Sequence, residues 1–358
     1  MPVGEDTRGV DTLEVVAVLL PFLYGLFFCV ALGNALLMLR PGVKKEGPAI
    51  RFLIPARDEE ENLRVLLPLL AAQGKITVFD DDSSDATAAV ARDLGAEVIR
   101  AEAPLPPGWT GKNRANHLLG FSDYEEEYIC FLDADVRVSP DFASRLRSMA
   151  QPNRVATAFP AIRHGDFPEP IMLGWVGWSL LALNPFFLVR LTGKGHNRFT
   201  NGQITLWPAE LYRKLRANEQ VRHHILEDVL IGRLLGKNNV PVDVAILSAD
   251  LSVQMYKTWR KAFDGMSKNS FEIAGSSLGT FLLAFFLLVL AWGWLILPWW
   301  GAALLFGSSV CTSAVVRGNI LYSLALPLSL TVGAVTLVRS WWWHRTGQTV
   351  WKGRKYTP

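Results

Sequence analysis

The distribution of charge along this chain of 358 residues restricts its fold more than any other feature. Residues 15–39 include no charged side chain, and neither do residues 273–316. Both stretches are longer than the roughly 20 apolar residues that a helix needs to cross a bilayer. The second has room for two spans that meet near Pro298, and residues 318–338 form a further candidate. The sequence therefore predicts a membrane protein with helical spans near both ends and a soluble domain between them.

Composition agrees with this prediction and excludes other classes. Charged residues make up 19% of the chain, which is below the roughly 25% of an ordinary soluble domain. The net charge of +3 argues against a nucleic-acid-binding protein that relies on bulk positive charge. The cysteines Cys29, Cys130 and Cys311 lie far apart along the chain. We interpret them as small apolar residues rather than as a metal or redox site.

The first apolar stretch predicts a transmembrane helix over residues 13–39, because it lacks a basic leader and is long for a signal peptide. Arg40, Lys44 and Lys45 follow it directly. Positive residues favour the cytoplasmic side, so we expect a multi-pass cell-membrane protein with a cytoplasmic domain over residues 41–277. Two or three spans follow over residues 278–338, and a basic tail follows over residues 339–358. Three spans put this tail outside, whereas its charge favours the inside. A re-entrant or incomplete span over residues 301–316 would resolve the conflict.

The middle of the chain alternates short β-rich runs with amphipathic helical runs, a pattern typical of an α/β fold with a mostly parallel sheet. The expected strands cover residues 51–54, 76–79, 97–99 and 128–132, and the helices cover residues 59–71 and 84–94. Carboxylates follow three of these strands, with Asp80–Asp82 and the pair Asp133 and Asp135 among them. A single Asp there often caps a helix. Several together at one sheet edge favour a divalent cation bound with substrate phosphates.

At these positions the sequence resembles family 2 glycosyltransferases of the GT-A fold, which is Rossmann-like. The matching pieces are IPARDEEENL (54–63), VFDDDSSDAT (78–87), FLDADV (131–136) and LEDVLIG (226–232). Three others resemble the membrane-bound branch with carotenoid (4,4'-diaponeurosporenoate-type) and hopanoid-associated glycosyltransferases: LPPGWTGKNRANHLLG (105–120), QMYKTWRKAFDGMSKN (254–269) and VWKGRKY (350–356).

The resemblance implies a role for individual residues. Pro55, Arg57 and Glu59 would line the nucleotide pocket, and Asp81 would contact the uracil or ribose side. Lys112 would face the diphosphate. The metal pair would be Asp133 and Asp135, with Asp135 as the direct ligand, and the sugar and acceptor region would include Asn201, Gly202, Gln203, Trp259 and Arg260.

Three departures from the family pattern bear on the reaction. Asp82 replaces the Gly that is usual in the Asp-Asp-Gly-Ser turn, so this turn is expected to differ. The Gly-Gly-His that relatives carry ahead of the Glu-Asp pair is absent. The Gln-x-x-Arg-Trp element of processive relatives is also absent, which favours transfer of a single sugar.

The chemistry of sugar transfer explains why these residue types are needed. Charge develops on the departing diphosphate, and Mg²⁺ or Mn²⁺ on Asp135 together with Lys112 would stabilise it. A hydroxyl acceptor needs a base, for which Asp228 beside Glu227 is the candidate. An ionised carboxylate acceptor needs none, so the presence of Asp228 favours a hydroxyl acceptor. Alternatively, Glu227 and Asp228 only complement a helix dipole.

The uncharged residues 171–189 form a further apolar segment. A single crossing there would separate Asp133 and Asp135 from Asp228, so we predict a helix pair that lies in the interface or lines the acceptor entrance. Arg190, Lys194 and Arg198 would then meet anionic headgroups. The alternative is a buried core helix.

Together these features predict an inverting, metal-dependent glycosyltransferase. It would move one sugar from a nucleotide sugar, with UDP-glucose expected, to a membrane lipid acceptor, with a carotenoid or related terpenoid as the first choice. Polyprenyl phosphate, a glycerolipid or a sphingolipid are the alternative acceptors. A membrane-anchored nucleotide-binding sensor or scaffold without transferase activity is the alternative from another class.

Overall fold

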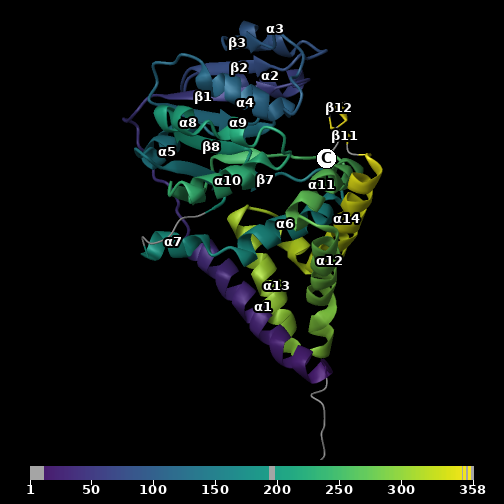
Figure 1. Ribbon diagram of the computed structural model, residues 1–358. Helices are drawn as coiled ribbons and strands as arrows, with labels where there is room; N and C mark the ends of the chain where they lie inside the picture. Colours follow the sequence, from purple (N-terminus) through teal and green to yellow (C-terminus); the bar gives the residue numbers. More distant parts are fainter. Residues whose placement is uncertain (1–11, 193–197, 349, 352–353, 356–358) are drawn as a thin grey trace, which may run out of the picture.

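The computed structural model describes residues 12–192, 198–348, 350–351 and 354–355. Lys194 and residues 352, 353 and 356 of the VWKGRKY piece therefore lie outside the described residues. Figure 1 shows a broad α/β domain at one end of the molecule and a group of apolar helices that narrows towards the other end.

A seven-stranded mixed sheet forms the centre of the α/β domain, in the order β3-β2-β1-β4-β8-β6-β9. Its strand β8 runs antiparallel to both of its neighbours, and the other neighbouring pairs are parallel. The strands are β1 (Ile50–Ala56), β2 (Ile76–Asp80), β3 (Glu97–Arg100), β4 (Tyr128–Leu132), β6 (Val155–Phe159), β8 (Ile204–Pro208) and β9 (Val242–Ile246). The expected α/β fold is thereby confirmed, and β4 has the bounds that its apolar run predicts.

Side chains alternate along β1 and so divide the core between the two faces of the sheet. Phe52 and Ile54 belong to one buried cluster, whereas Leu53 belongs to the cluster on the other face. The helices that cover the sheet are α2 (Glu60–Leu70), α3 (Thr87–Asp93), α4 (Gly111–Phe121), α5 (Phe142–Met149), α8 (Ala209–Leu215), α9 (Ala217–Gln220) and α10 (Glu227–Lys237).

Helix α3 begins three residues later than the sequence predicts. The Ser84 amide donates to the Asp58 carboxylate, with 2.7 Å between N and Oδ1. The Thr87 amide donates to Asp85 Oδ1 at 3.0 Å. Short polar side chains that accept hydrogen bonds from nearby amides in this way favour a turn over a helix. The residues before Thr87 therefore form a turn at the edge of the sheet.

A second, three-stranded sheet joins the domain to the apolar helices, in the order β5-β10-β7. Its strands are β5 (Val136–Val138), β7 (Ala161–Ile162) and β10 (Leu251–Val253). Strand β5 directly follows the Asp133–Asp135 turn, and the chain after β10 leads into the first of the C-terminal helices. The small sheet therefore connects the candidate metal pair with the apolar helices.

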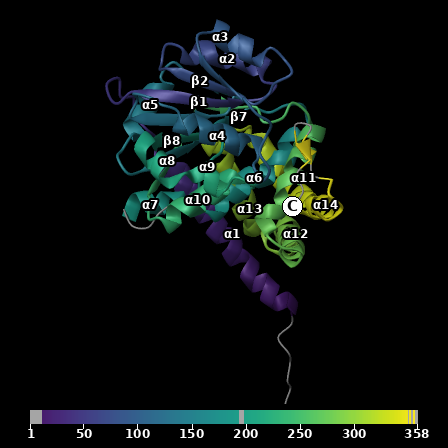
Figure 2. The same cartoon turned by 45° about the horizontal axis from the view of Figure 1, so that its top comes forward.

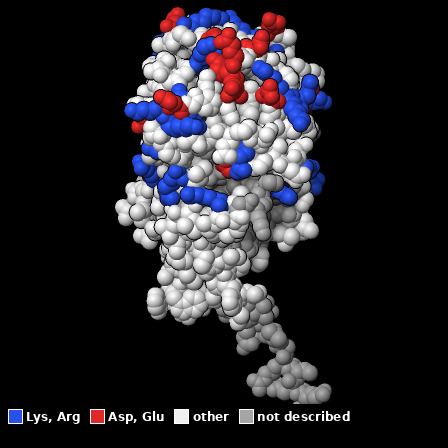
Figure 3. All heavy atoms as spheres, turned by 90° about the vertical axis from the view of Figure 1, so that its left-hand side faces the viewer, with Lys and Arg blue, Asp and Glu red and all other residues white. Residues whose placement is uncertain are grey.

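The apolar helices pack around a third core that includes Tyr24, Trp178, Leu290 and Leu330. On the face drawn in Figure 3, Lys, Arg, Asp and Glu cover the α/β domain and are missing from the described surface of the narrow end. The elements are α1 (Thr12–Leu37), α6 (Glu169–Leu183), α7 (Phe186–Thr192), α11 (Trp259–Ala274), α12 (Ser277–Trp292), η1 (Gly293–Ile296), α13 (Trp299–Val315), η2 (Ile320–Ala325), α14 (Leu326–Thr346), β11 (Val350–Trp351) and β12 (Arg354–Lys355).

Four helical segments among the described residues are long and apolar enough to cross a membrane: Val18–Leu37, Glu169–Thr192, Ser277–Ile296 and Ile320–Thr346. Helix α13 is apolar but shorter. Each of these segments has the length and composition of a membrane span. The contacts at the ends of a segment show which elements it lies against.

The segment Glu169–Thr192 is a pair of helices, as predicted, with its break at Asn184 and Pro185. The buried Asn34 of α1 holds this break. Its amide nitrogen donates to the carbonyls of Leu181 and Asn184, and its oxygen accepts from the Phe187 amide. A polar side chain inside an apolar core thus satisfies backbone groups that the helix break exposes.

The chain between α13 and α14 contacts the α/β domain. At the end of α13, the Val316 carbonyl accepts from the Ile162 amide of β7, and the Tyr322 ring of η2 lies 5.4 Å from that of His164. At the far end of α14, Trp343 and Gln348 line the same pocket as Asp133. In Figure 1, α12 and α13 instead extend towards the narrow end, and Figure 2 shows α14 beside α11 at the base of the domain.

Candidate active site

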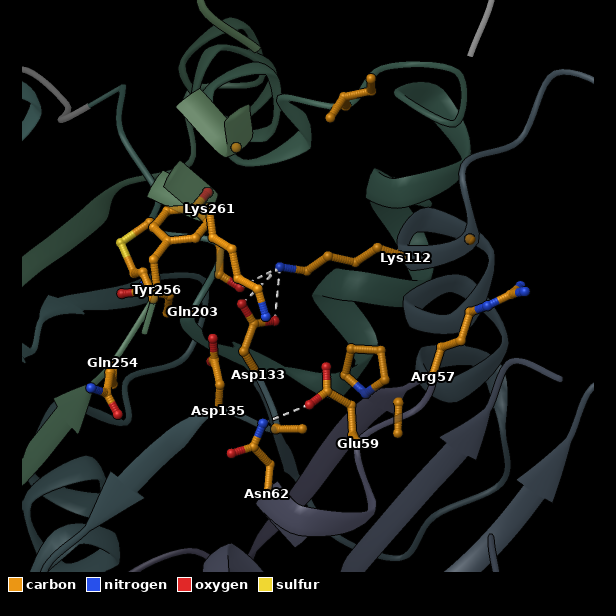
Figure 4. Close-up of a pocket in the computed structure, with 18 of the residues that line it drawn as sticks. Arg57, Glu59, Asn62, Lys112, Asp133, Asp135, Gln203, Gln254, Tyr256 and Lys261 are labelled. Carbon is orange, nitrogen blue, oxygen red and sulfur yellow. Dashed lines mark hydrogen bonds and ion pairs between the residues drawn. The ribbon is translucent and has the colours of Figure 1, made fainter. Parts of the chain in front are cut away.

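One large pocket of about 1330 Å³ opens at the carboxyl ends of β1, β2 and β4. Among the residues predicted for the site, those that line it are Pro55, Arg57, Glu59, Asp81, Lys112, Asp133, Asp135, Asn201, Gly202, Gln203, Glu227 and Asp228. Trp259 and Arg260 do not line it. Figure 4 shows Asp133 and Asp135 near the middle, with Lys112 and Arg57 on one side and Gln254 and Tyr256 on the other.

Lys112 lies at the centre of the charged cluster. Its Nζ is 2.8 Å from Asp133 Oδ1 and 3.2 Å from Glu227 Oε1, and it donates to the Gly202 carbonyl at 3.0 Å. Burial alone would lower the pKa of Lys112, but the carboxylates of Asp133 and Glu227 outweigh burial and raise that pKa. The side chain therefore stays charged and ties three separate segments together.

The Gly-Trp-Thr-Gly-Lys piece places Lys112 by capping α4. Thr110 accepts from the Asn113 amide, and the buried Asn113 side chain donates to the carbonyls of Val221 and His224. This fixes the start of α4 against the loop that leads to Glu227. The sequence analysis gave Asn113 no role in the site. Its position in the first turn of α4, after the Thr110 cap, is a signal that could have pointed to it.

Asp135 is the residue whose surroundings best fit a cation. Its side chain is largely buried, and its Oδ1 has no hydrogen-bond partner among the described residues. Burial raises its pKa, and the charges of Asp133 and Glu59 raise it further. An unpartnered carboxylate oxygen beside two other carboxylates is costly unless a cation joins it. Asp133 and Asp135 therefore fit a divalent ion.

The protein supplies only part of a coordination shell at this place. In the described part of the chain, no group of three or more His, Cys, Asp or Glu residues is arranged to hold a metal. Magnesium commonly takes one or two carboxylates and completes its shell with water and substrate phosphates. The pair is thus consistent with an ion that arrives with a diphosphate substrate.

Asp228 already accepts two backbone hydrogen bonds. Its Oδ2 accepts from the Gly202 amide at 3.1 Å, and its Oδ1 accepts from the Val229 amide at 2.8 Å. A side chain at position 202 would begin 3.3 Å from Asp228, Glu227 and Lys112, so this glycine permits the close approach. Burial raises the pKa of both Glu227 and Asp228, and Lys112 opposes the effect. Asp228 therefore holds the loop at Gly202 against the start of α10.

The opposite end of the pocket carries Arg57 and Asp81. The Arg57 guanidinium donates to the Asp81 carbonyl at 3.4 Å and lies 3.9 Å from its carboxylate. The next residue, Asp82, has a φ of 61°, which is the left-handed region that favours glycine. Asp82 therefore has the left-handed backbone conformation that a glycine would adopt at this position, and it adopts that conformation under strain. The expected difference in this turn is not seen in the φ angle.

Replacing Asp82 with Gly is expected to raise stability by about 1 kcal/mol, because the left-handed conformation no longer costs steric strain. Transfer activity should change less than twofold, since the Asp82 side chain is exposed and does not line the pocket. Thermal unfolding of the detergent-purified protein measures the first effect. A lower melting temperature for Asp82→Gly would show that the carboxylate has a stabilising role of its own.

Helix phase explains why α11 contributes other residues than Trp259 and Arg260. Positions Lys261, Asp264, Gly265 and Lys268 share one face at helical spacing, and this face lines the pocket. Trp259 and Arg260 precede that face, and the Arg260 guanidinium lies over the Trp259 ring instead. The prediction was thus near the site, but Arg260 and Trp259 stand one and two positions before Lys261 and do not line the pocket.

Two residues of the QMYKTWRKAFDGMSKN piece after β10 were not predicted for the site. Gln254 and Tyr256 line the pocket, and the Tyr256 phenol packs against Gly265 of α11, where an added Cβ would lie 2.1 Å from its oxygen. Burial raises the pKa of Tyr256 to about 12, and the charge of Asp135 adds to the effect. Tyr256 is therefore a neutral hydroxyl on the far side of the carboxylates from Arg57. The apolar residues of β10 that precede Tyr256 do not indicate that its hydroxyl lies in the pocket.

The segment Ile171–Val189, predicted to lie in the interface or line the acceptor entrance, does not line the large pocket. Its residues Leu173, Gly174, Gly177 and Trp178 instead border a separate cavity of about 60 Å³ against α13. Residues of α11 and α14 line the large pocket instead, among them Lys261 and Trp343.

Comparison with known families is decisive for the domain. The model of the family described as "Glycosyl transferase family 2" matches residues 52–172, which carry β1 to β7 and both Asp133 and Asp135. The chain contains a family 2 glycosyltransferase domain. The match includes the strand ends that carry these carboxylates, and it confirms the predicted enzyme class of this glycosyltransferase.

Named relatives of the glycosyltransferase include 4,4'-diaponeurosporenoate glycosyltransferases. The protein from Staphylococcus aureus (strain USA300) is 25% identical over 350 residues, which cover 86% of this chain and 88% of the relative. The protein from Staphylococcus haemolyticus is 25% identical over 244 residues, or 63% of each chain. The chain thus spans less than two thirds of that relative's length.

Solved structures with a similar arrangement include S. aureus TarS 1–349 in complex with UDP. It is 15% identical, with a TM-score of 0.40, and the match covers 86% of this chain and 95% of that one. Another is glucosyl-3-phosphoglycerate synthase from Mycobacterium tuberculosis with Mn²⁺, UDP and glucosyl-3-phosphoglycerate. It is 18% identical with a TM-score of 0.38 over 62% of this chain and 78% of that one.

Proposed function

We propose that this glycosyltransferase moves a single sugar from a UDP-sugar to a lipid acceptor in the membrane, with inversion at the anomeric carbon. The observation that carries the proposal is the cluster of Lys112, Asp133 and Glu227, with the unpartnered oxygen of Asp135 beside it, inside a family 2 domain. A sensor that only binds nucleotide would need neither the second carboxylate pair nor a pocket that extends to the apolar helices.

The donor would lie with its nucleoside towards Pro55, Arg57 and Asp81. The diphosphate would lie near Asp135 and Lys112. A divalent ion, Mg²⁺ or Mn²⁺, held by Asp135 and Asp133 would neutralise the diphosphate as it departs. The buried ammonium of Lys112 supplies a second positive charge at a fixed position, where the surrounding protein strengthens its effect.

The acceptor would approach from the side of Gln203, Gln254 and Tyr256. For a hydroxyl acceptor, Asp228 is the proposed base, because each of its oxygens keeps a lone pair beyond the backbone bond that it accepts. Glu227 would hold Lys112 in place. The name of the S. aureus relative makes a carotenoid or related terpenoid the first candidate acceptor, and polyprenyl phosphate is the second.

UDP release tests this function directly. Detergent-purified protein with Mn²⁺ should release UDP from one member of a UDP-sugar panel, with UDP-glucose expected, and release should depend on added total membrane lipid. Mass spectrometry of the lipid should then show one added sugar. Tight metal-dependent UDP binding without release from any donor would favour the nucleotide-binding scaffold instead.

The contacts of α14 support a defined arrangement in the membrane. Because Tyr322 and Trp343 both lie against the α/β domain, the chain between them begins and ends on one side. Helices α12 and α13 form a hairpin that crosses or enters the bilayer, and α1 crosses it. The basic tail then stays with the domain on the cytoplasmic side, which agrees with its charge.

Cysteine labelling tests this arrangement in sealed vesicles, with Cys29 and Cys311 replaced by alanine. A cysteine at Thr346 should react from the same side as one at Lys45. A cysteine at Trp299, which is 83% exposed at the start of α13, should not react from that side. Reaction of the Thr346 and Trp299 positions from the same side, opposite to Lys45, would mean that α14 crosses the membrane.

A further inference from the structure

One aromatic side chain in the large pocket comes from an apolar helix. Trp343 lines the pocket and belongs to the last turns of α14. The segment Ile320–Thr346, which contains it, has the length and composition of a membrane span. No step of the proposed transfer uses this indole ring, although it belongs both to the pocket and to a helix that can contact lipid.

The residue before Trp343 lies on a different face of the same helix. Trp342 is 56% exposed and does not line the pocket. It shares one face of α14 with the exposed residues Leu328, Val335 and Val338, at spacings of seven, three and four residues. Neighbouring side chains on a helix point about 100° apart. The end of α14 therefore presents one indole on its exposed apolar face and the next one to the pocket.

Contacts with α11 hold the ring of Trp343. The Arg339 guanidinium lies 4.1 Å from the centre of this ring and 4.5 Å from the centre of the Phe263 ring of α11. It is paired with Asp264 at 2.7 Å and donates to Ser267 Oγ at 3.3 Å. A cation over an aromatic face is attracted to it, and the ion pair fixes the cation in turn. The indole is thus a rigid apolar surface in the wall of the pocket.

The same contacts place Trp343 on the α11 side of the pocket. The guanidinium that stacks on the Trp343 ring pairs with Asp264 of α11. The next residue, Gly265, packs against the Tyr256 phenol. Figure 4 shows Tyr256 across the carboxylate pair from Arg57. Because the nucleoside of the donor is proposed to lie towards Arg57, the Trp343 ring is in position to meet the other substrate.

From these contacts we propose that Trp343 is an acceptor-binding residue, with Arg339 as its positioning residue. The ring packs against the apolar atoms of the lipid that lie next to its reacting oxygen. The inference rests on the proposed function. A lipid bound in this way keeps its chain among apolar groups, because the exposed apolar face of α14 begins one residue away, at Trp342. An indole ring buries a large apolar area and has little conformational freedom to lose on binding.

The half-saturating concentration of lipid tests this role in detergent. Total membrane lipid is titrated into the purified protein with Mn²⁺ and a saturating UDP-sugar. Trp343→Ala should raise the half-saturating concentration about tenfold, and Trp343→Phe about threefold, since the smaller ring keeps part of the contact. The KM for the UDP-sugar and Mn²⁺-dependent UDP binding should stay at the wild-type values. If the alanine variant does not fold, the phenylalanine variant gives the same comparison.

Trp342→Ala is the matched control, because it removes the same ring from the exposed face one residue away. It should leave the half-saturating lipid concentration unchanged. Equal effects at positions 342 and 343, or no effect at position 343, would overturn the proposal. A raised KM for the UDP-sugar with an unchanged lipid requirement would mean that the ring contacts the donor, which overturns it too.

A double-mutant cycle tests whether Arg339 acts through Trp343. Arg339→Gln alone should raise the half-saturating lipid concentration about fivefold, because the ring loses the cation that holds it. In the Trp343→Ala background the same substitution should cause no further rise. Additive effects would show that Arg339 serves the pocket in another way and would contradict its positioning role. Arg339→Lys takes its place in the cycle if the glutamine variant does not fold.

Failure of this inference is distinguishable from failure of the proposed function. Lipid-dependent transfer by the wild-type protein, together with an unchanged lipid requirement in the position 343 variants, contradicts the inference alone. Binding of the UDP-sugar without transfer to any lipid contradicts both.

Discussion

Replacing Asp135 with Asn is expected to lower sugar transfer about 10³-fold, because an amide keeps the shape of the carboxylate and removes the charge that would hold a divalent ion. Among the described residues, no other group can take the place of this charge. Asp135 Oδ1 has no hydrogen-bond partner there, and these residues offer no third ligand for the ion. Mn²⁺-dependent UDP binding, measured by titration calorimetry, should be lost in the same variant.

The control for Asp135→Asn is Asp243→Asn, which removes a carboxylate that pairs with Arg154 away from the pocket. This control should keep both transfer and metal-dependent binding. Unchanged Mn²⁺-dependent UDP binding by Asp135→Asn would show that the ion is held elsewhere.

Replacing Lys112 with Met should lower the rate of transfer about 10²-fold, with a smaller effect on the KM for the UDP-sugar. The ammonium would stabilise charge that develops as the diphosphate leaves, so its loss affects the transition state more than binding. Its removal also leaves Asp133 and Glu227 facing each other without the cation that joins them.

Lys112→Arg provides the comparison, because it keeps the charge but changes the shape and the reach of the group. Partial activity of the arginine variant together with a folded but inactive methionine variant would assign the effect to charge. Equal loss in both variants with a lowered melting temperature would instead show that Lys112 is chiefly structural.

Much of the inner half of the site follows from sequence. Strands β1, β2 and β4 are short apolar runs, and the carboxyl ends of parallel strands meet at one edge, so the convergence of Asp81, Asp133 and Asp135 is predictable. The contact between Lys112 and Glu227 could not be predicted from the sequence. It depends on the hydrogen bonds by which Asn113 holds α4 against the loop before α10.

The outer half was predicted less well, for reasons of geometry. Apolar composition drew attention to residues 171–189 as a helix pair in the interface or at the acceptor entrance, yet composition does not tell which face of a helix meets a pocket. The phase of α11 selects Lys261 over Arg260, and the last turns of α14 bring Trp343 to the pocket. Both depend on contacts between α11 and α14, such as the one between Asp264 and Arg339, which are 75 residues apart.

Sugar transfer to a membrane lipid should require Asp135 in this pocket. The most direct measurement is UDP release by the purified protein with Mn²⁺ and a UDP-sugar, with and without total membrane lipid, beside the Asp135→Asn variant. We expect lipid-dependent release that this variant lacks, together with one added sugar on the lipid by mass spectrometry. Equal UDP release with and without lipid, or equal release by Asp135→Asn, would contradict it.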